Sequence, residues 1–288
     1  MKKDNSSFAA RITNLTVAAR YIKESIQCIR QGYAWSDKII LSLHFLKIPI
    51  FFFVSVFKKI ELIEAENKYK KLWGNVTLKN KDGIFFCGKN IMTVYLLAEA
   101  YQDSFNDYMK LNEGVFLDVG AHIGKYTVRI GKMLKNNGKV VALEPEKYNF
   151  SLLNKNVHLN NLNNVVSINK GAFFRKDTLS FYVTGNDAEG EHSLLKRSNT
   201  FNETKVDVDT LDNIVSELQL NRVDLIKIDV EGVEAEVLKG AKGILEKYHP
   251  KCIIEAWNEE YLAKVVAELK PYRYEKYIQI DFDNYFFE

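Results

Sequence analysis

Proline and cysteine are scarce in this sequence, and their scarcity excludes several kinds of protein. The 288 residues include four prolines and three cysteines, so there is no proline-rich linker, and domain boundaries must be found from changes of pattern. Cys28, Cys87 and Cys252 are far apart and form no C-x-x-C motif. This spacing argues against a disulfide framework or a zinc site and fits a reducing compartment. We therefore expect a cytoplasmic protein, with membrane association left open by the segment considered next.

A secretory signal and a clean transmembrane segment are also lacking. Residues 1–20 contain no uninterrupted apolar stretch of the kind that a signal peptide needs. Residues 39–57 are apolar and long enough to be considered as a span, but Lys47 near the middle would cost about 2.5–3.5 kcal/mol on insertion, and Pro49 removes a backbone donor. We expect residues 39–57 to lie at a membrane surface or to be buried in the protein rather than to cross a bilayer.

Charge is distributed unevenly along the chain. Residues 1–90 contain sixteen Lys or Arg and seven Asp or Glu, whereas the rest of the chain has an excess of acidic residues. A basic front end suits an anionic membrane or nucleic acid, although a solvated basic face is the more common explanation. The sequence leaves open a peripheral membrane contact through residues 1–60, and we expect no nucleic-acid partner.

The front segment also contains an apolar stripe. Its members recur at alternating spacings of four and three, which predicts an amphipathic helix: Phe8, Ile12, Leu15, Ala19, Ile22, Ile26 and Ile29. The body of the protein, a membrane surface or a second subunit in a homodimer could cover this stripe. We assign residues 1–72 to a helical, basic and partly hydrophobic N-terminal segment, and residues 73–288 to a second domain.

From residue 73 the pattern changes to that of an α/β domain. A β-hairpin is expected at residues 75–79 and 84–87, followed by a helix at residues 93–107. Beyond it, short apolar runs alternate with amphipathic stretches, which predicts a mostly parallel sheet with helices on both faces. The strands are expected at residues 115–119, 140–144, 165–169, 223–229 and 252–257.

The ends of these strands carry polar residues, and ligands bind at strand ends in parallel sheets. The first strand runs into the turn Asp118-Val119-Gly120-Ala121-His122-Ile123-Gly124, whose glycines permit a tight turn beneath a ligand. The turn is not a dinucleotide fingerprint, because His122 stands where G-x-G-x-x-G requires glycine. Glu144 ends the second strand and could accept hydrogen bonds from ribose hydroxyls. Together these features favour an adenosyl ligand.

A later strand ends in Lys227-Ile228-Asp229-Val230-Glu231-Gly232. Two carboxylates beside a cofactor could take a proton from a hydroxyl, orient it, or bind a divalent cation. Alternatively, Asp229 could cap the next helix or pair with Lys227. We assign no metal site, and we name Asp229 and Glu231 as candidate catalytic residues, with His122 and His192 as rival bases.

The body resembles the FkbM family of methyltransferases. The resemblance spans residues 113–257 and is carried by LDVGAHIGKYTV (117–128), ALEP (142–145), VDVDTLDNI (206–214), VDLIKIDVEGVEAEVLKGAKGIL (223–245) and IIEAW (253–257). It implies a class I methyltransferase (Rossmann-like) fold and S-adenosyl-L-methionine as cofactor. It also implies three groups of cofactor contacts. The turn residues would hold the methionine end, Glu144 the ribose, and Gly171 and Ala172, after the third strand, the adenine. The turn residues are Asp118, Gly120, Ala121, His122 and Gly124.

The resemblance also implies transfer of a methyl group to a hydroxyl oxygen, with a carbohydrate or glycolipid-type acceptor. Two other functions are compatible with the sequence. A non-catalytic, membrane-peripheral module could retain the fold without turnover, since fold does not establish function. A nicotinamide-dependent oxidoreductase shares the sheet and the strand-end acid, and the absence of glycine at position 122 counts against it.

Overall fold

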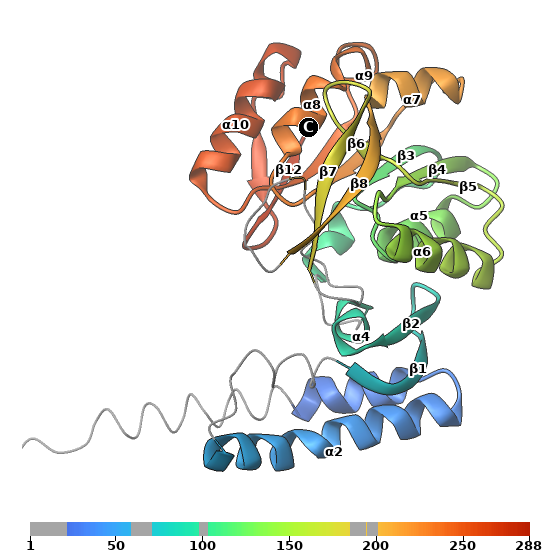
Figure 1. The fold of residues 1–288 in the computed structure, drawn as a ribbon. Helices are drawn as coiled ribbons and strands as arrows, with labels where there is room; N and C mark the ends of the chain where they lie inside the picture. The colour runs from blue at the N-terminus through green and yellow to red at the C-terminus, as the bar shows by residue number, and fades with distance from the viewer. Residues whose placement is uncertain (1–21, 59–70, 98–102, 185–193, 195–200) are drawn as a thin grey trace, which may run out of the picture. The chain divides into compact units, whose positions relative to one another are not determined.

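The structure, a computed structural model, describes residues 22–58, 71–97, 103–184, 194 and 201–288. The chain divides into two compact units, Met1–Tyr101 and Gln102–Glu288 (Figure 1). The predicted apolar stripe of residues 8–29 lies mostly outside the described residues, as does the loop that contains His192.

In the first unit, helices pack on the predicted hairpin. Residues 22–31 are helical, and Asp37 ties the second helix to the hairpin because its carboxylate accepts the main-chain N–H groups of Ala34 and Thr77 at 2.7 and 3.1 Å. This unit therefore extends past the hairpin, and the predicted boundary at residues 72/73 falls inside it. The elements are α2 (Trp35–Lys58), β1 (Lys71–Lys79), β2 (Ile84–Asn90) and α4 (Ile91–Leu97).

The structure bears on two predictions for this region, the absence of a membrane-spanning helix and the helix at residues 93–107. No helix in the described ranges is long and apolar enough to cross a membrane. Of the single helix expected at residues 93–107, the described residues belong to α4 up to Leu97 and to a 3-10 turn, η1 (Asp103–Asp107), so the last part is 3-10 and not α-helical. The helix α4 begins at Ile91, and the side-chain oxygen of Asn90 just before it accepts the main-chain N–H of Met92 at 2.8 Å.

The second unit is built on a seven-stranded sheet in the order β11-β12-β10-β9-β3-β4-β5. The five strands from β10 to β5 are parallel, and β12 is antiparallel to its neighbours. The prediction of a mostly parallel sheet is confirmed. Its strands are β3 (Gly114–Val119), β4 (Gly138–Leu143), β5 (Val165–Ile168), β9 (Leu225–Ile228), β10 (Lys251–Glu255), β11 (Tyr277–Gln279) and β12 (Asn284–Phe287).

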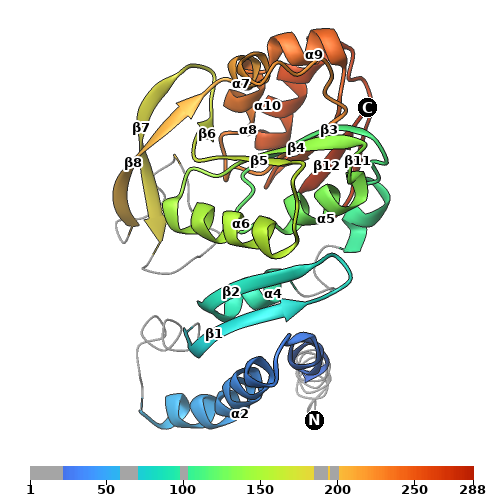
Figure 2. The same cartoon turned by 90° about the vertical axis from the view of Figure 1, so that its right-hand side faces the viewer.

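Helices cover both faces of this sheet, because side chains alternate along each strand. Phe116 of β3 packs with residues of α5, whereas Leu117 packs with residues of the helices on the opposite face. Figure 2 shows α5 and α6 on one face and the later helices on the other. The helices are α5 (Lys125–Leu134), α6 (Lys147–Leu159), α7 (Leu211–Glu217), α8 (Glu234–Lys239), α9 (Lys242–Tyr248) and α10 (Glu259–Leu269), with the 3-10 turn η2 (Lys270–Tyr272).

A second sheet, absent from the sequence prediction, lies between β5 and α7 in the chain. Its order is β6-β8-β7, and β7 pairs with β8 along its whole length. Many of its positions are polar and exposed, which leaves a weak hydrophobic pattern in the sequence. Its strands are β6 (Gly171–Ala172), β7 (Asp177–Thr184) and β8 (Phe201–Asp209).

Candidate active site

The candidate site lies where the order of the parallel strands reverses. The chain passes from β3 to β4 and β5 on one side, and returns later to β9 and β10 on the other. Such a switch point opens a crevice at the carboxyl ends of the strands, where ligands of α/β sheets bind. Asp118, the last residue but one of β3, pairs with Lys227 of β9. The predicted strand-end residues therefore meet at one place in the fold.

The turn from β3 to α5 has the geometry expected of a ligand cradle. Gly120, His122 and Gly124 all have left-handed backbone conformations, with φ values of 79°, 51° and 90°. A Cβ atom on Gly120 would overlap the main-chain oxygen of Asp229. Only glycine fits here, because the turn presses against the end of β9 and its φ disfavours a side chain.

Glu144 holds this turn from the neighbouring strand. One oxygen of its buried carboxylate accepts the main-chain N–H of His122 at 2.8 Å, and the other accepts that of Glu146 at 2.9 Å. Burial raises the pKa of Glu144 to about 8, despite these two donors. Each oxygen keeps further capacity to accept a hydrogen bond. His122 thus contributes its main chain to the cradle.

Asp118 and Lys227 form a buried pair of opposite charges at the switch point. Both are fully or almost fully buried. Burial raises the pKa of Asp118, and Lys227 and the hydroxyl of Thr127, 2.5 Å from Oδ2, oppose that rise. Burial opposes the charge of Lys227, but the carboxylates of Asp229 and Asp118 outweigh it and raise the pKa of Lys227. Oδ1 of Asp118 has no hydrogen-bond partner among the described residues.

Three carboxylates gather beside Lys227. Oxygens of Asp229, Glu231 and Glu255 lie within 4.8 Å of one another, and Lys227 Nζ is 2.9 Å from Oδ2 of Asp229. Burial and then the nearby carboxylates raise the pKa of Glu255 to about 10, so this group holds a proton at neutral pH. The pairing of Asp229 with Lys227, which the sequence left as an alternative, is present, and it does not prevent Asp229 from facing the other carboxylates.

Glu255 and Glu234 were not among the predicted site residues. Glu255 is the last residue of β10 and Glu144 directly follows β4, so the same strand-end argument could have found Glu255. Glu234 is buried, and its Oε1 accepts the N–H groups of Val230 and Gly232 at 3.2 and 2.9 Å. It fixes the turn that carries Glu231, whose φ is 62°. No sequence pattern distinguishes it from an ordinary acidic residue at a helix start.

The two residues predicted near an adenine lie in β6. Gly171 and Ala172 are buried and pair with β8, and a Cβ on Gly171 would meet Pro145, which follows Glu144. The amide of Asn169 donates to the main-chain oxygens of Glu144 and Pro145 at 2.9 and 3.0 Å. The structure therefore places the β5–β6 connection against the strand end that carries Glu144.

A family model described as the methyltransferase FkbM domain matches residues 118–276, more than half of the chain. The chain belongs to the FkbM methyltransferase family. Its mostly parallel sheet with helices on both faces is that of the class I methyltransferase fold, as the sequence predicted. The cofactor of this FkbM domain is S-adenosylmethionine.

Two curated proteins and one solved structure are similar to this FkbM chain. Methyltransferase 1 of Beauveria bassiana is 28% identical over 166 residues, which cover 51% of this chain and 66% of that protein. Methyltransferase sdnD of Sordaria araneosa is 27% identical over 204 residues, covering 60% and 78% of the two chains. The structure of methyltransferase FkbM from Methylobacillus flagellatus KT has 17% identity and a TM-score of 0.45, with 69% of this chain and 54% of that chain covered. The match thus spans just under two thirds of the Beauveria protein and about half of the Methylobacillus chain.

The residues of this site fit S-adenosylmethionine. The Gly120 turn packs directly against the main chain of Asp229, which brings the turn beside the end of β9. The unsatisfied oxygen of buried Asp118 suits a ligand that carries a cationic amino group. Glu144 has acceptor capacity for a ribose on both oxygens.

Proposed function

We propose that this protein transfers a methyl group from S-adenosylmethionine to a hydroxyl oxygen of a small-molecule acceptor. The observation that supports the proposal most is the meeting of Asp118, Gly120 and Glu144 with Asp229 at one switch point, where the main chain of Asp229 abuts Gly120 and its charge acts on Asp118. In the proposal, Asp118, Gly120 and Gly124 hold the methionine end and Glu144 holds the ribose. Ala121 and His122 add contacts from the same turn, and Gly171 and Ala172 lie near the adenine.

The proposed chemistry needs alignment and one proton acceptor. When bound, S-adenosylmethionine supplies a methyl group that its sulfonium already activates. Asp229 would accept a hydrogen bond from the acceptor hydroxyl and take its proton during the transfer. Lys227 holds Asp229 in place. Glu231 orients the hydroxyl, and protonated Glu255 keeps the group of three carboxylates from carrying three negative charges.

The acceptor in this proposal is a carbohydrate or glycolipid-type hydroxyl compound. The competing function, a non-catalytic module that retains the fold, would need no catalytic carboxylate beside the cofactor cradle. The close approach of the Gly120 turn to the end of β9 supports the catalytic proposal, because it puts the proposed base next to the proposed cofactor. Calorimetry with S-adenosylhomocysteine, followed by transfer of labelled methyl groups to cell extract, distinguishes the two.

The first prediction separates binding from turnover. Glu144→Ala should weaken S-adenosylhomocysteine binding about 10- to 100-fold, because it removes the acceptor of the ribose hydroxyls. Asp229→Asn should leave binding within a few-fold of the wild type and lower methyl transfer about 100-fold or more. Calorimetry measures the first quantity, and label incorporation at saturating cofactor measures the second.

Asp107→Asn is the matched control, since the Asp107 side chain is 81% exposed and pairs with Lys110. It should change neither quantity. A wild-type protein with no affinity for S-adenosylhomocysteine would overturn the proposed function and favour the non-catalytic module. Full turnover in Asp229→Asn would remove Asp229 from the mechanism.

We also propose a peripheral membrane contact through the first unit. Along α2, exposed apolar side chains recur at spacings of four, four and three, opposite a buried stripe that includes Leu41 and Phe45. Lys23 and Lys38 in this unit would complement an anionic surface. Alternatively, a second copy of the chain could cover the apolar stripe of residues 8–29 in a homodimer. The exposed stripe consists of Trp35, Ile39, Leu43 and Leu46.

A further inference from the structure

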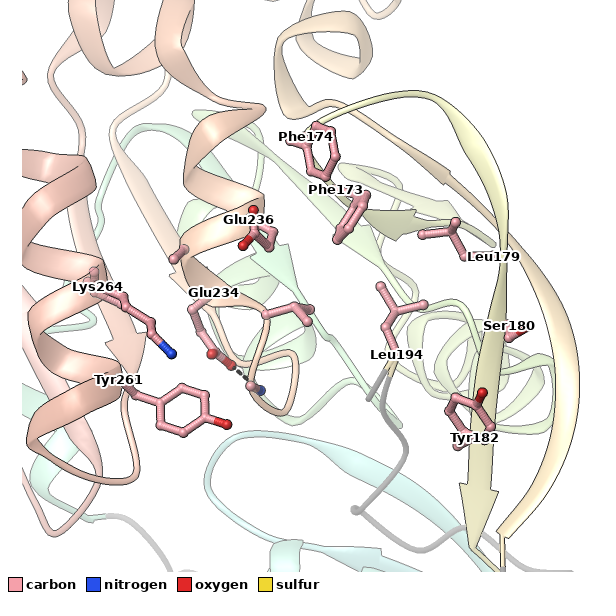
Figure 3. A pocket seen from close by; sticks show the side chains of 14 residues that line it. Phe173, Phe174, Leu179, Ser180, Tyr182, Leu194, Glu234, Glu236, Tyr261 and Lys264 are labelled. Carbon is pink, nitrogen blue, oxygen red and sulfur yellow. Dashed lines mark hydrogen bonds between the residues drawn. The ribbon is translucent and has the colours of Figure 1, made fainter. Parts of the chain in front are cut away.

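A cavity of about 710 Å³ lies in the second unit between the β7–β8 arm and helices α8 and α10 (Figure 3). This volume is within the usual range for small-molecule sites. Figure 3 shows side chains from the two walls facing each other across the space. One wall includes Phe173, Phe174 and Leu179, and the other includes Val233, Val265 and Tyr261.

The cavity adjoins the carboxylate group through one turn of the chain. Gly232, Val233 and Glu234 line it, and they directly follow Asp229 and Glu231. Oε1 of Glu234 accepts the N–H groups that lead into this turn, so the floor of the cavity and the carboxylate end of β9 are held together. A ligand seated in the cavity would therefore present its near end to the proposed base.

The charged groups at the cavity already have partners. Lys264 Nζ is 2.8 Å from Glu260, and Glu236 is 2.8 Å from Lys239. These pairs lie at partly exposed positions, where surface charges contribute little to binding. What the cavity offers a ligand is mainly apolar and aromatic surface, including the adjacent rings of Phe173 and Phe174, whose centroids are 4.5 Å apart.

Hydroxyl groups add a small polar component to this surface. Tyr182 and Tyr261 stand on opposite walls, and the labelled ring of Tyr261 points into the space from α10. Aromatic side chains of this kind bind apolar frameworks through their faces and fix orientation through their hydroxyls. A free saccharide, which exposes hydroxyls on every side, would bury polar groups against these walls at a cost.

We propose that this cavity binds the apolar body of the methyl acceptor, and that the acceptor is a neutral amphipathic alcohol. Such a compound carries its hydroxyl on an apolar or aromatic framework, as a glycoside with an apolar aglycone does. This inference rests on the proposed methyl transfer and narrows its acceptor class. It excludes an unsubstituted polar saccharide as the preferred acceptor.

Alkyl β-glucosides of graded chain length test the inference with the full-length protein. Methyl, hexyl and octyl glucoside are titrated by calorimetry, below their micelle concentrations and with saturating S-adenosylhomocysteine. Because the chain would lie against apolar walls, each added CH₂ should tighten binding about two- to fourfold. Methyl glucoside and free glucose should bind weakest.

Two variants with matched controls locate the binding. Phe174→Ala removes one wall and should weaken octyl glucoside binding about fivefold or more, whereas Phe282→Ala, at a residue that is 93% exposed, should not. Ala235→Trp fills the cavity from α8 and should abolish the dependence on chain length. Ala263→Trp, at an exposed position of α10, should leave it intact.

The outcomes separate this inference from the proposed function. Affinity that does not depend on chain length, or that Ala235→Trp leaves unchanged, would overturn the inference even if S-adenosylhomocysteine binds. Binding that depends on chain length in a protein without affinity for S-adenosylhomocysteine would support the cavity as a ligand site and overturn methyl transfer. Tighter binding of glucose than of octyl glucoside would overturn the proposed acceptor class.

Discussion

At the scale of single residues, the site is defined by carboxyl groups whose environments differ. Glu144 is buried between two main-chain donors, and Asp229 is half-buried beside Lys227. Glu255 ends the neighbouring strand and faces other carboxylates. Burial favours the neutral form of a carboxyl group and a nearby cation favours the charged form. Carboxyl groups can therefore have three different proposed roles here: Glu144 binds the ribose, Asp229 acts as the base, and Glu255 stays protonated.

The raised pKa of Glu144 makes stability depend on pH. The folded protein holds this proton up to about pH 8, whereas an ordinary glutamate loses it near pH 4.5. The folded state then binds more protons than the unfolded chain between these values, so the free energy of unfolding should fall as pH rises from about 4.5 to about 8. The fall from this group is at most about 5 kcal/mol. Glu144→Gln should flatten the slope, as measured by urea unfolding of the cofactor-free protein.

Glu260→Gln is the control for this measurement. The pairing of Glu260 with Lys264 lowers its pKa, so the change should not alter the slope between pH 5 and 8. The side-chain amide in Glu144→Gln keeps only one acceptor oxygen, so the variant can differ in stability at every pH. The informative quantity is therefore the change of its free energy of unfolding with pH. Parallel stability curves for the wild type and Glu144→Gln would show that Glu144 is ionised throughout this range.

At the scale of elements, α9 begins without a capping side chain at its own N-cap, Ala241. Asp212 of α7 supplies the cap instead, since its two oxygens accept the N–H groups of Gly243 and Ile244, each at 2.9 Å. An acidic group is also favoured at a helix start by the helix dipole. One side chain thereby joins two helices that cover the same face of the sheet.

Removal of this cap should destabilise the second unit. Asp212→Ala leaves two N–H groups without their acceptor and should lower the free energy of unfolding by about 1–2 kcal/mol. Thermal unfolding should show a lower melting temperature, and Asp212→Asn should lose less because it keeps one acceptor oxygen. Asp107→Ala, at an exposed residue, serves as control. Equal stability of Asp212→Ala and the wild type would contradict the assignment of this cap.

At the scale of the whole molecule, the chain joins a methyltransferase unit to a unit with an exposed apolar helix face. Trp35 is 81% exposed and Leu46 is 66% exposed. Contiguous exposed apolar side chains are uncommon on proteins without a binding partner. With Lys38 beside Trp35, at 5.3 Å from Nζ to the ring centroid, these residues suit the headgroup region of an anionic membrane.

Vesicle sedimentation tests this membrane contact in the full-length protein. Binding to vesicles of phosphatidylcholine and phosphatidylglycerol should exceed binding to pure phosphatidylcholine, and it should weaken with salt. Ile39→Asp should reduce binding about tenfold or more, because it places a charge in the apolar stripe. Phe282→Asp, an equally drastic change at an exposed residue of the other unit, should have no effect. Binding that Ile39→Asp leaves unchanged would contradict a contact through α2.

The sequence by itself determined the parallel sheet, the Gly120–Gly124 turn and the strand-end acids. These follow from local rules, because hydrophobic runs predict strands and left-handed positions require glycine or tolerate few other residues. It did not predict the β6–β8 sheet, where polar, exposed positions weaken the pattern. It also predicted one α-helix at residues 93–107, where Asp103–Asp107 form the 3-10 turn η1.

Only the tertiary structure decided which acidic residues meet. Glu255 lies 26 residues after Asp229 in the sequence, and it reaches the same crevice because β10 pairs with β9 in parallel. The cavity beside them depends on α8, α10 and the β7–β8 arm, which are separate in the chain. Strand order and burial are global properties, and they set both the positions and the charge states of these groups.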